Sequence, residues 1–191
     1  MRITVEPLTA TRWPDLEAVF LARGCAVARG CWCMYYRQSG APSTDPAPAA
    51  AAARRAALRA LVDAGRFTGL IGYRDGQPVG WISFGPREDF AKLARSPVMK
   101  PVDVQPVWSI VCFVVPAAHR RQGVARALLQ GAVAWAAGHG VALLEAYPVD
   151  KTTRSNDQDL WFGSPSMFDA AGFREVARRR PQRPVVRLRP V

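Results

Sequence analysis

The residues with the clearest chemical potential form a short basic loop between a predicted strand and a predicted helix. A helix N-terminus carries unpaired N–H groups and a partial positive charge. A glycine in such a loop lets a ligand approach the backbone closely, and arginines add full positive charges. The loop therefore predicts a phosphate or pyrophosphate site, with a simple strand-to-helix turn carrying surface arginines as the alternative. Its residues are Arg120, Arg121, Gln122, Gly123, Val124 and Ala125.

The elements on either side of this loop are predicted from their patterns of apolar residues. Residues 108–115 are apolar almost throughout and rich in β-branched side chains, which is typical of a buried strand, and Pro116 ends it. The helix is expected from about Gly123 to about Gly138, because its apolar side chains recur on one helical face. These are Val124, Leu128, Leu129, Ala132 and Trp135.

The loop and its strand resemble the acetyl-CoA signature of the GNAT N-acetyltransferases, Gln/Arg-x-x-Gly-x-Gly/Ala, which Arg120 through Ala125 match. The strand end, Phe113-Val114-Val115-Pro116, looks like the family's fourth strand. The P-loop and dinucleotide-binding glycine patterns fit less well. The resemblance implies acetyl-CoA as co-substrate, with its pyrophosphate on the loop and its pantetheine arm and thioester on Phe113, Val114 and Val115.

The order of predicted elements is strand, two helices, hairpin, strand, helix, strand, helix and two strands. This order predicts an α/β fold, a mixed sheet with helices on both faces, and it is similar to the GNAT order over nearly the whole chain. Residues 1–191 are expected to form a single domain, in which 41–53 are a mobile Pro/Ala-rich connection. Asp75-Gly76 predicts the hairpin turn, Thr11 a helix cap, and residues 141–147 the strand after the long helix.

Two titratable residues on residues 141–147 are candidates for the proton transfers. An amine must lose a proton before it attacks a thioester, so a base is needed. Glu145 and Tyr147 share one face of the strand, and partial burial of Glu145 would raise its pKa and make it a better base. The alternative is that Glu145 simply pairs with an arginine.

One position departs from the family pattern. Many members carry a tyrosine in the last helix, in a pattern like Leu-Tyr-x-x-x-Gly-Phe, where this chain has Phe168. A phenylalanine cannot protonate the leaving thiolate, so Tyr147, Ser166 or water must do so, or the thiolate leaves unassisted. The departure keeps a second hypothesis open: a non-catalytic acyl-CoA-binding or regulatory module with a basic C-terminal partner-binding surface.

The acceptor implied by the resemblance is a primary amine of a small molecule or peptide. Aromatic side chains that could line its pocket are Trp32, Tyr35, Tyr36, Trp81, Trp161 and Phe162. The apolar, aromatic segment from Gly24 to Tyr36, which contains Cys31-Trp32-Cys33, fits two interpretations equally, core packing between helices and a wall of the acceptor pocket.

The amino-acid composition bears on the ligands, the metal content and the cellular location that we expect. The net charge of +11 rests on 23 arginines and three lysines, which favours polyanionic ligands such as coenzyme A. Seven arginines lie between Arg174 and Arg189. We interpret them as side chains on the solvated outer face of two terminal strands, and a nucleic-acid-binding patch is the alternative. Four cysteines and two histidines lack zinc spacing, so no metal is expected. Without a signal peptide or a membrane span, we expect a cytoplasmic protein, whose oligomeric state stays open, a homodimer included.

Overall fold

A seven-stranded mixed sheet organises the chain in the computed structural model, which describes residues 3–39, 47–150 and 161–191. The strand order is β1-β2-β3-β4-β5-β7-β6, and β4 and β5 form the one parallel pair of this sheet. The predicted α/β fold is confirmed. The strands are β1 Ile3–Pro7, β2 Gly69–Arg74, β3 Gln77–Pro86, β4 Trp108–Val114, β5 Leu144–Ala146, β6 Arg174–Arg180 and β7 Arg183–Leu188.

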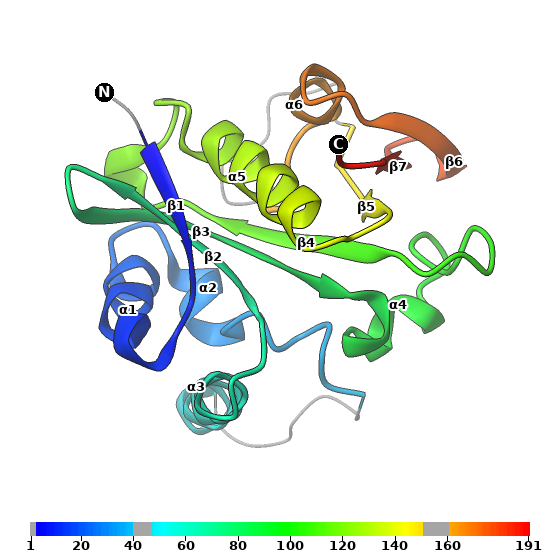
Figure 1. Cartoon of the computed structure of the whole chain (residues 1–191). Helices are drawn as coiled ribbons and strands as arrows, with labels where there is room; N and C mark the ends of the chain where they lie inside the picture. The colour runs from blue at the N-terminus through cyan, green and yellow to red at the C-terminus, as the bar shows by residue number, and fades with distance from the viewer. Residues whose placement is uncertain (1–2, 40–46, 151–160) are drawn as a thin grey trace.

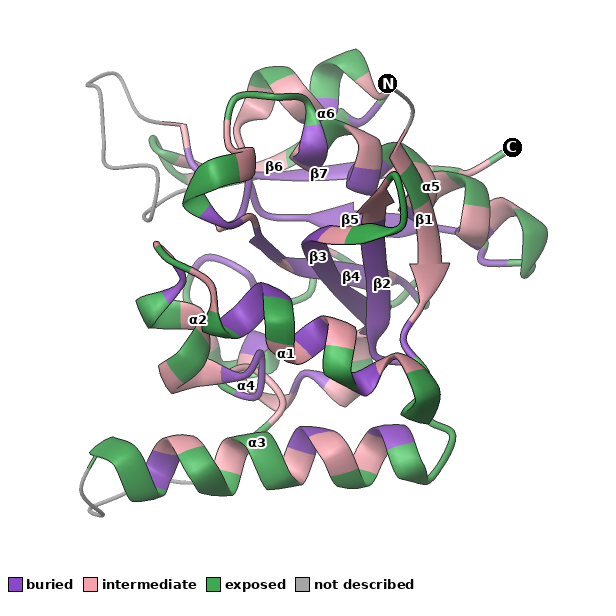
Figure 2. Ribbon diagram, turned by 90° about the vertical axis from the view of Figure 1, so that its left-hand side faces the viewer, coloured by how far each residue is buried: buried purple, intermediate pink, exposed green. Residues whose placement is uncertain are grey.

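Helices cover both faces of this sheet (Figure 1). On one face lie α1 (Trp13–Leu21), α2 (Ala26–Cys31) and α3 (Ala47–Asp63), and on the other lie α5 (Val124–Gly138) and α6 (Pro165–Ala170). The short α4 (Ala91–Arg95) follows β3. Figure 2 shows the buried strands between the two helical layers. Among the helices described, none has both the length and the apolar character that crossing a bilayer requires.

A bulge in β4 opens the sheet next to the predicted ligand loop. Ser83 of β3 pairs with Cys112, and Phe84 pairs with Ile110, so Val111 between them has no partner on β3. On its other side β4 pairs with β5 only over Trp108–Ile110. The strand predicted over 141–147 is therefore only three residues long, because β4 has no β5 partner beyond Ile110.

The predicted helix after the loop is confirmed and begins at Val124. Gly123 precedes it with φ of +79°, a left-handed conformation that glycine adopts without steric cost. The helix packs closely on β3, since a Cβ atom at Gly80 would lie 2.7 Å from Val124 Cγ1. This contact fixes the helix N-terminus beside the opened edge of β4.

Of three further local predictions, the hairpin turn is confirmed, whereas the helix cap and part of the mobile connection are wrong. The hairpin turn at Asp75-Gly76 is confirmed, with φ of +50° and +76°. Thr11 does not cap α1, because a 3₁₀ turn at Ala10–Arg12 precedes the helix and Arg12 is its N-cap residue. Helix α3 begins at Ala47, so residues 47–53 of the expected mobile connection are helical, and 41–46 lie outside the described residues. Alanine-rich sequence favours this helix, and Pro48 is tolerated in its first turn.

Candidate active site

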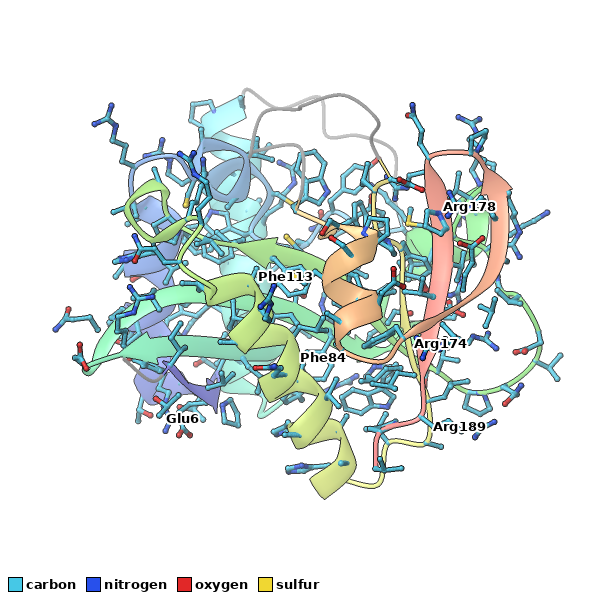
Figure 3. The ribbon with its side chains drawn as sticks, turned by 90° about the horizontal axis from the view of Figure 1, so that it is seen from above. Glu6, Phe84, Phe113, Arg174, Arg178 and Arg189 are labelled. Carbon is cyan, nitrogen blue, oxygen red and sulfur yellow. The ribbon has the colours of Figure 1, made fainter. Side chains whose placement is uncertain are left out.

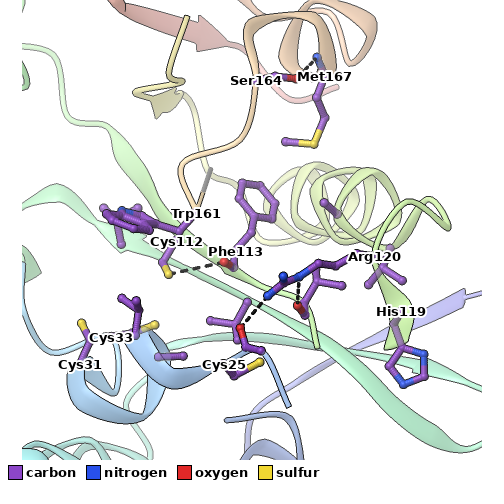
Figure 4. A pocket seen from close by; sticks show the side chains of 18 of the residues that line it. Cys25, Cys31, Cys33, Cys112, Phe113, His119, Arg120, Trp161, Ser164 and Met167 are labelled. Carbon is purple, nitrogen blue, oxygen red and sulfur yellow. Dashed lines mark hydrogen bonds between the residues drawn. The ribbon is translucent and has the colours of Figure 1, made fainter. Parts of the chain in front are cut away.

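A cavity of about 1150 Å³ lies where β4 opens (Figure 4). The bulged half of β4 and the N-terminus of α5 form its floor and one end, and α2 with the following loop forms a wall. The segment before and within α6 closes it from another side. The volume is sufficient for a ligand larger than most small metabolites.

Eight of the nine predicted cofactor residues line this cavity. They are Phe113, Val114, Val115, Arg120, Arg121, Gly123, Val124 and Ala125. The ninth, Gln122, does not line it. Its side chain accepts a hydrogen bond of 2.5 Å from Arg74 Nη1 and donates one of 2.7 Å to the carbonyl of Ala118. Gln122 therefore holds the loop to neighbouring segments.

The two arginines of the loop differ in role. Arg120 donates hydrogen bonds to the carbonyls of Val115, at 3.1 Å, and Gly24, at 2.6 Å, and so ties β4 to the segment before α2. Arg121 lines the cavity from a backbone with φ of +58°, and Arg126 of α5 joins it there. The arrangement separates a positioning residue, Arg120, from two cations available to a ligand.

The N-terminus of α5 is open to an anion. Its N-cap residue, Gly123, has no side chain to accept a hydrogen bond from the first turn, and that turn holds no acidic residue. The first N–H groups of a helix have no intrahelical partner, and they carry the positive end of the helix dipole. Gly123, Val124 and Ala125 lie at the cavity, so this helix end can bind a phosphate.

Glu145 and Tyr147, predicted as base and acid, lie elsewhere. Both are fully buried, and neither lines the cavity. Glu145 pairs with Arg87 Nη1 at 2.5 Å and with Arg187 Nε at 2.8 Å, and Tyr147 donates a hydrogen bond of 2.6 Å to it. The geometry favours the ion-pair alternative for Glu145, because a fully buried carboxylate is stable only when paired.

Tyr147 is held as a neutral phenol. Burial raises its pKa far above the usual range, the charge of Glu145 raises it further, and Arg87 partly opposes the rise. Its hydroxyl is also within 2.9 Å of Ser109 Oγ. A group so placed contributes to the core under β4 and β5 rather than to the cavity.

Phe168, which stands where relatives carry a tyrosine, is fully buried. Its ring packs edge-on against Phe113 and Phe173, with centroids 6.2 Å and 5.1 Å apart. It does not line the cavity, whereas Ser166 of the same helix does. The position therefore serves packing between α6 and β4 in this chain.

The Cys31-Trp32-Cys33 segment serves both core packing and the cavity wall. Trp32 is buried and stacks on Phe20, whereas both cysteines line the cavity. Of the predicted aromatic linings, Tyr35, Tyr36 and Trp161 reach it, while Trp32, Trp81 and Phe162 belong to the core. Cys25 and Cys112 also line it, a gathering of thiols that their sequence spacing does not reveal.

Several arginines between Arg174 and Arg189 bond to other groups of the chain. Figure 3 labels Arg174, Arg178 and Arg189 beside the two terminal strands. Arg187 pairs with Glu145 and Asp103, and Arg178 pairs with Glu175 and Asp150. Arg179 donates to the carbonyls of Val98, Lys100 and Pro101. The exposed Arg174, Arg178, Arg180 and Arg189 agree with the expected outer face, whereas Arg187 is buried. In the described ranges, no three His, Cys, Asp or Glu side chains are placed to hold a metal ion.

Comparison with known proteins identifies the family to which this chain belongs. A profile described as the acetyltransferase (GNAT) family matches residues 31–159, about two thirds of the sequence. The chain belongs to the GNAT acetyltransferase family. Among proteins with curated descriptions, none is significantly similar to it.

Solved structures agree on the fold. A polyamine N-acetyltransferase from Drosophila melanogaster is 13% identical, with a TM-score of 0.56 and coverage of 98% of this chain and 100% of that one. The PaiA N-acetyltransferase from Thermoplasma acidophilum, solved in complex with coenzyme A, is 13% identical, with a TM-score of 0.52 and 99% coverage of both chains. At these identities the structures establish a shared architecture.

Proposed function

We propose that this protein is an acetyl-CoA-dependent N-acetyltransferase that moves an acetyl group directly to a primary amine of a small molecule or peptide. The observation that carries the proposal is the uncapped N-terminus of α5, with Arg121 and Arg126, at one end of a cavity that runs along the opened part of β4. A phosphate-bearing thioester with a long arm matches that shape and charge. The coenzyme A bound to the Thermoplasma relative supports this choice.

The residues present fit such a co-substrate. Gly123, Val124 and Ala125 would hold its pyrophosphate through backbone N–H groups, with Arg121 adding charge. The pantetheine arm would lie along Val115 and Val114 toward Phe113. Acetyl-CoA would supply an activated acetyl thioester, and the chain would supply position and a largely apolar enclosure.

A backbone N–H of β4 could polarise the carbonyl of a bound thioester by donating a hydrogen bond to it. The N–H of Phe113 donates a hydrogen bond of 2.7 Å to the carbonyl of Trp161. That N–H can act on a thioester only if the bond to Trp161 opens. The N–H of Phe113 is therefore already engaged with the segment that precedes α6.

The acceptor would enter on the α2 side of the cavity. Tyr35 and Tyr36 contribute aromatic surface there, and Arg54 of α3, which donates to the carbonyl of Gly30 at 2.7 Å, contributes a positive charge. These side chains suit an amine with an apolar or negatively charged portion. The alternative, a non-catalytic acyl-CoA binder, is favoured only by Phe168, while the internal pairing of the C-terminal arginines argues against its partner surface.

Two measurements test the proposal together. Calorimetry with acetyl-CoA measures binding, and thiol release over a panel of amines measures transfer. Gly123→Glu should abolish binding, because it places bulk and negative charge at the phosphate site. Gly140→Glu is the matched control, since Gly140 also has a positive φ and also has open space around its Cα. Equal loss in both variants, or no binding by the unmutated protein, would contradict the assignment. Binding without release from any amine would favour the binder.

A further inference from the structure

Apart from a histidine, the charged or titratable side chains of the cavity that bear on a ligand's charge are arginines. Arg120, Arg121 and Arg126 come from the ligand loop and the first turn of α5, and Arg54 comes from α3. His119 belongs to the turn before the loop. No aspartate or glutamate is among the described residues that line the cavity. A lining of this kind attracts anions beyond the phosphate site itself.

Arg54 lies at the opposite end of α2 from the ligand loop. Helices α2 and α3 pack side by side (Figure 2). Arg54 Nη1 donates a hydrogen bond of 2.7 Å to the carbonyl of Gly30, near the end of α2. Arg120 of the loop instead bonds to the carbonyl of Gly24, just before α2 begins. The 6 residues of α2 span roughly 9 Å, so Arg54 is separated from the phosphate site.

The guanidinium of Arg54 is oriented by its hydrogen bond to Gly30. A guanidinium carries five N–H donors in a planar fork, and that bond occupies one of them. Among the described residues no carboxylate forms an ion pair with Arg54, whereas Arg59 of the same helix pairs with Asp63 at 2.8 Å. A planar fork fixed in this way is suited to binding the carboxylate of a ligand.

Two further cations lie beside the tyrosines of the α2 side. Lys92 Nζ lies 3.8 Å from the centroid of the Tyr35 ring. The guanidinium of Arg183 lies 4.5 Å from the centroid of Phe162, whose ring packs edge-on against Tyr36 at 5.7 Å. Nε of Arg183 is buried and has no hydrogen-bond partner in the part of the chain that the structure describes. Neither cation lines the cavity, but both make this side of it more positive.

Asp89, an acid close to the same side, is already paired. Its carboxylate binds Arg37, the residue after Tyr36, at 3.1 Å, and it binds Arg66 at 3.0 Å. Two guanidinium groups on one carboxylate leave a net positive charge there. A ligand with an ammonium group at each end would therefore place one of them near cations without a described counter-charge, which disfavours its binding.

We propose that the acceptor is an amine that also carries a carboxylate, and that Arg54 binds this carboxylate while the amine points toward Phe113. This inference rests on the proposed function. The carboxylate supplies the counter-charge that the α2 side lacks, and the carbon chain between the two groups contacts Tyr35 and Tyr36. Free amino acids and peptides with an acidic side chain both carry such a pair of groups. Polyamines and aminoglycosides, which are polycations, do not fit.

The first test compares amines of matched length that differ in the charge at the far end. 4-Aminobutanoate carries a carboxylate, 4-aminobutanamide a neutral amide and 1,4-diaminobutane an ammonium group. Thiol release should give kcat/KM in that order, with a ratio of about tenfold or more between the first two, the scale of one charge-assisted hydrogen bond. Shorter and longer amino acids, each beside its amide, determine the spacing. The C-terminally amidated dipeptides glycyl-aspartate and glycyl-asparagine test peptide acceptors.

The second test removes the guanidinium. Arg54→Gln should raise KM for the preferred carboxylate amine, so that kcat/KM falls about 10- to 100-fold, and should change kcat/KM for its amide less than about threefold. The ratio of the two effects measures the coupling between Arg54 and the carboxylate, and it does not depend on the basicity of the amines. Arg59→Gln removes the same charge elsewhere on α3 and is the matched control, which should leave both values unchanged. Melting temperatures and KM for acetyl-CoA are measured on the same samples.

The outcomes separate this inference from the proposed function. Acetylation that prefers the carboxylate amine at no chain length overturns the acceptor class and leaves the acetyltransferase intact. Equal losses for the carboxylate amine and its amide in Arg54→Gln overturn the role of Arg54, and so does a raised KM for acetyl-CoA, which would assign Arg54 to the co-substrate. A wild type that binds acetyl-CoA and acetylates no amine overturns the proposed function as well.

Discussion

Tyr147 donates a hydrogen bond of 2.6 Å to Oε1 of Glu145, two residues earlier in the chain, and neither side chain is exposed. Arg87 contacts both groups, at 2.5 Å from Glu145 and 2.6 Å from the Tyr147 hydroxyl. Arg187 reaches the other oxygen of Glu145 from β7 and also pairs with Asp103. These bonds join β5 and β7 to the 3₁₀ turn after β3, and they satisfy a charge that would otherwise be costly to bury.

Replacing the central carboxylate tests this structural role. Glu145→Gln should lower the free energy of unfolding by about 3 kcal/mol, because the half-buried Arg87 loses its carboxylate partner and the buried Arg187 keeps only Asp103. Below the melting temperature, turnover should fall less than about tenfold. Chemical denaturation and steady-state kinetics on the same samples measure both. Glu175→Gln, in an exposed ion pair with Arg178, is the control and should cost less than about 1 kcal/mol. A stable variant with turnover reduced about 10²-fold would restore Glu145 as the base.

Sequence could show that Glu145 and Tyr147 share a face, because strand periodicity is local. It could not show their partners, since Arg87 lies 58 residues before Glu145 and Arg187 lies 42 residues after it. The sequence also could not show the length of β5. It depends on the bulge at Val111, a property of the pairing between β3 and β4 rather than of residues 141–147.

The packing of Phe168 leads to a second prediction. Phe168→Tyr would bury a hydroxyl in an apolar cluster, on a ring packed against Phe113 and Phe173. We expect a loss of about 1–3 kcal/mol in stability and no gain in turnover, even when combined with Tyr147→Phe. Thermal unfolding and thiol release measure the two effects. Turnover that rises with the added hydroxyl would show that the helix can present an acid to the cavity after all.

The contrast between the loop arginines gives a third prediction. Arg121→Ala should weaken acetyl-CoA binding by about 1–3 kcal/mol, roughly 5- to 150-fold in Kd, and leave the melting temperature nearly unchanged. Arg120→Ala should lower the melting temperature, because the hydrogen bonds to Val115 and Gly24 are lost. Calorimetry and thermal unfolding of both variants separate the effects. Equal losses of stability would contradict the division of roles.

The sequence predicted those elements whose structure is determined by residues close together in the chain. A continuous apolar run gave β4, helical periodicity gave α5, and the glycine and arginines between them gave the ligand loop. The gathering of thiols at the cavity could not be predicted, because Cys112 lies on β4 and Cys33 in the loop after α2, and only the fold brings both to one cavity. The outward-turned side chain of Gln122 likewise depends on Arg74, which is 48 residues distant.

Tyr36 provides a prediction about pH. Burial raises its pKa to about 12, although the charge of Arg183 opposes the shift. A raised value means that folding favours the neutral phenol, so this contribution to stability is complete below about pH 10 and is lost as the pH rises toward 12. The cavity wall should therefore stay uncharged at this position while amine acceptors lose their protons. In folded protein at about pH 10, absorbance at 295 nm should be the same for wild type and Tyr36→Phe. Circular dichroism confirms that both are folded. A wild-type excess equal to half of one tyrosinate would place the pKa of Tyr36 at its ordinary value and would contradict the burial argument.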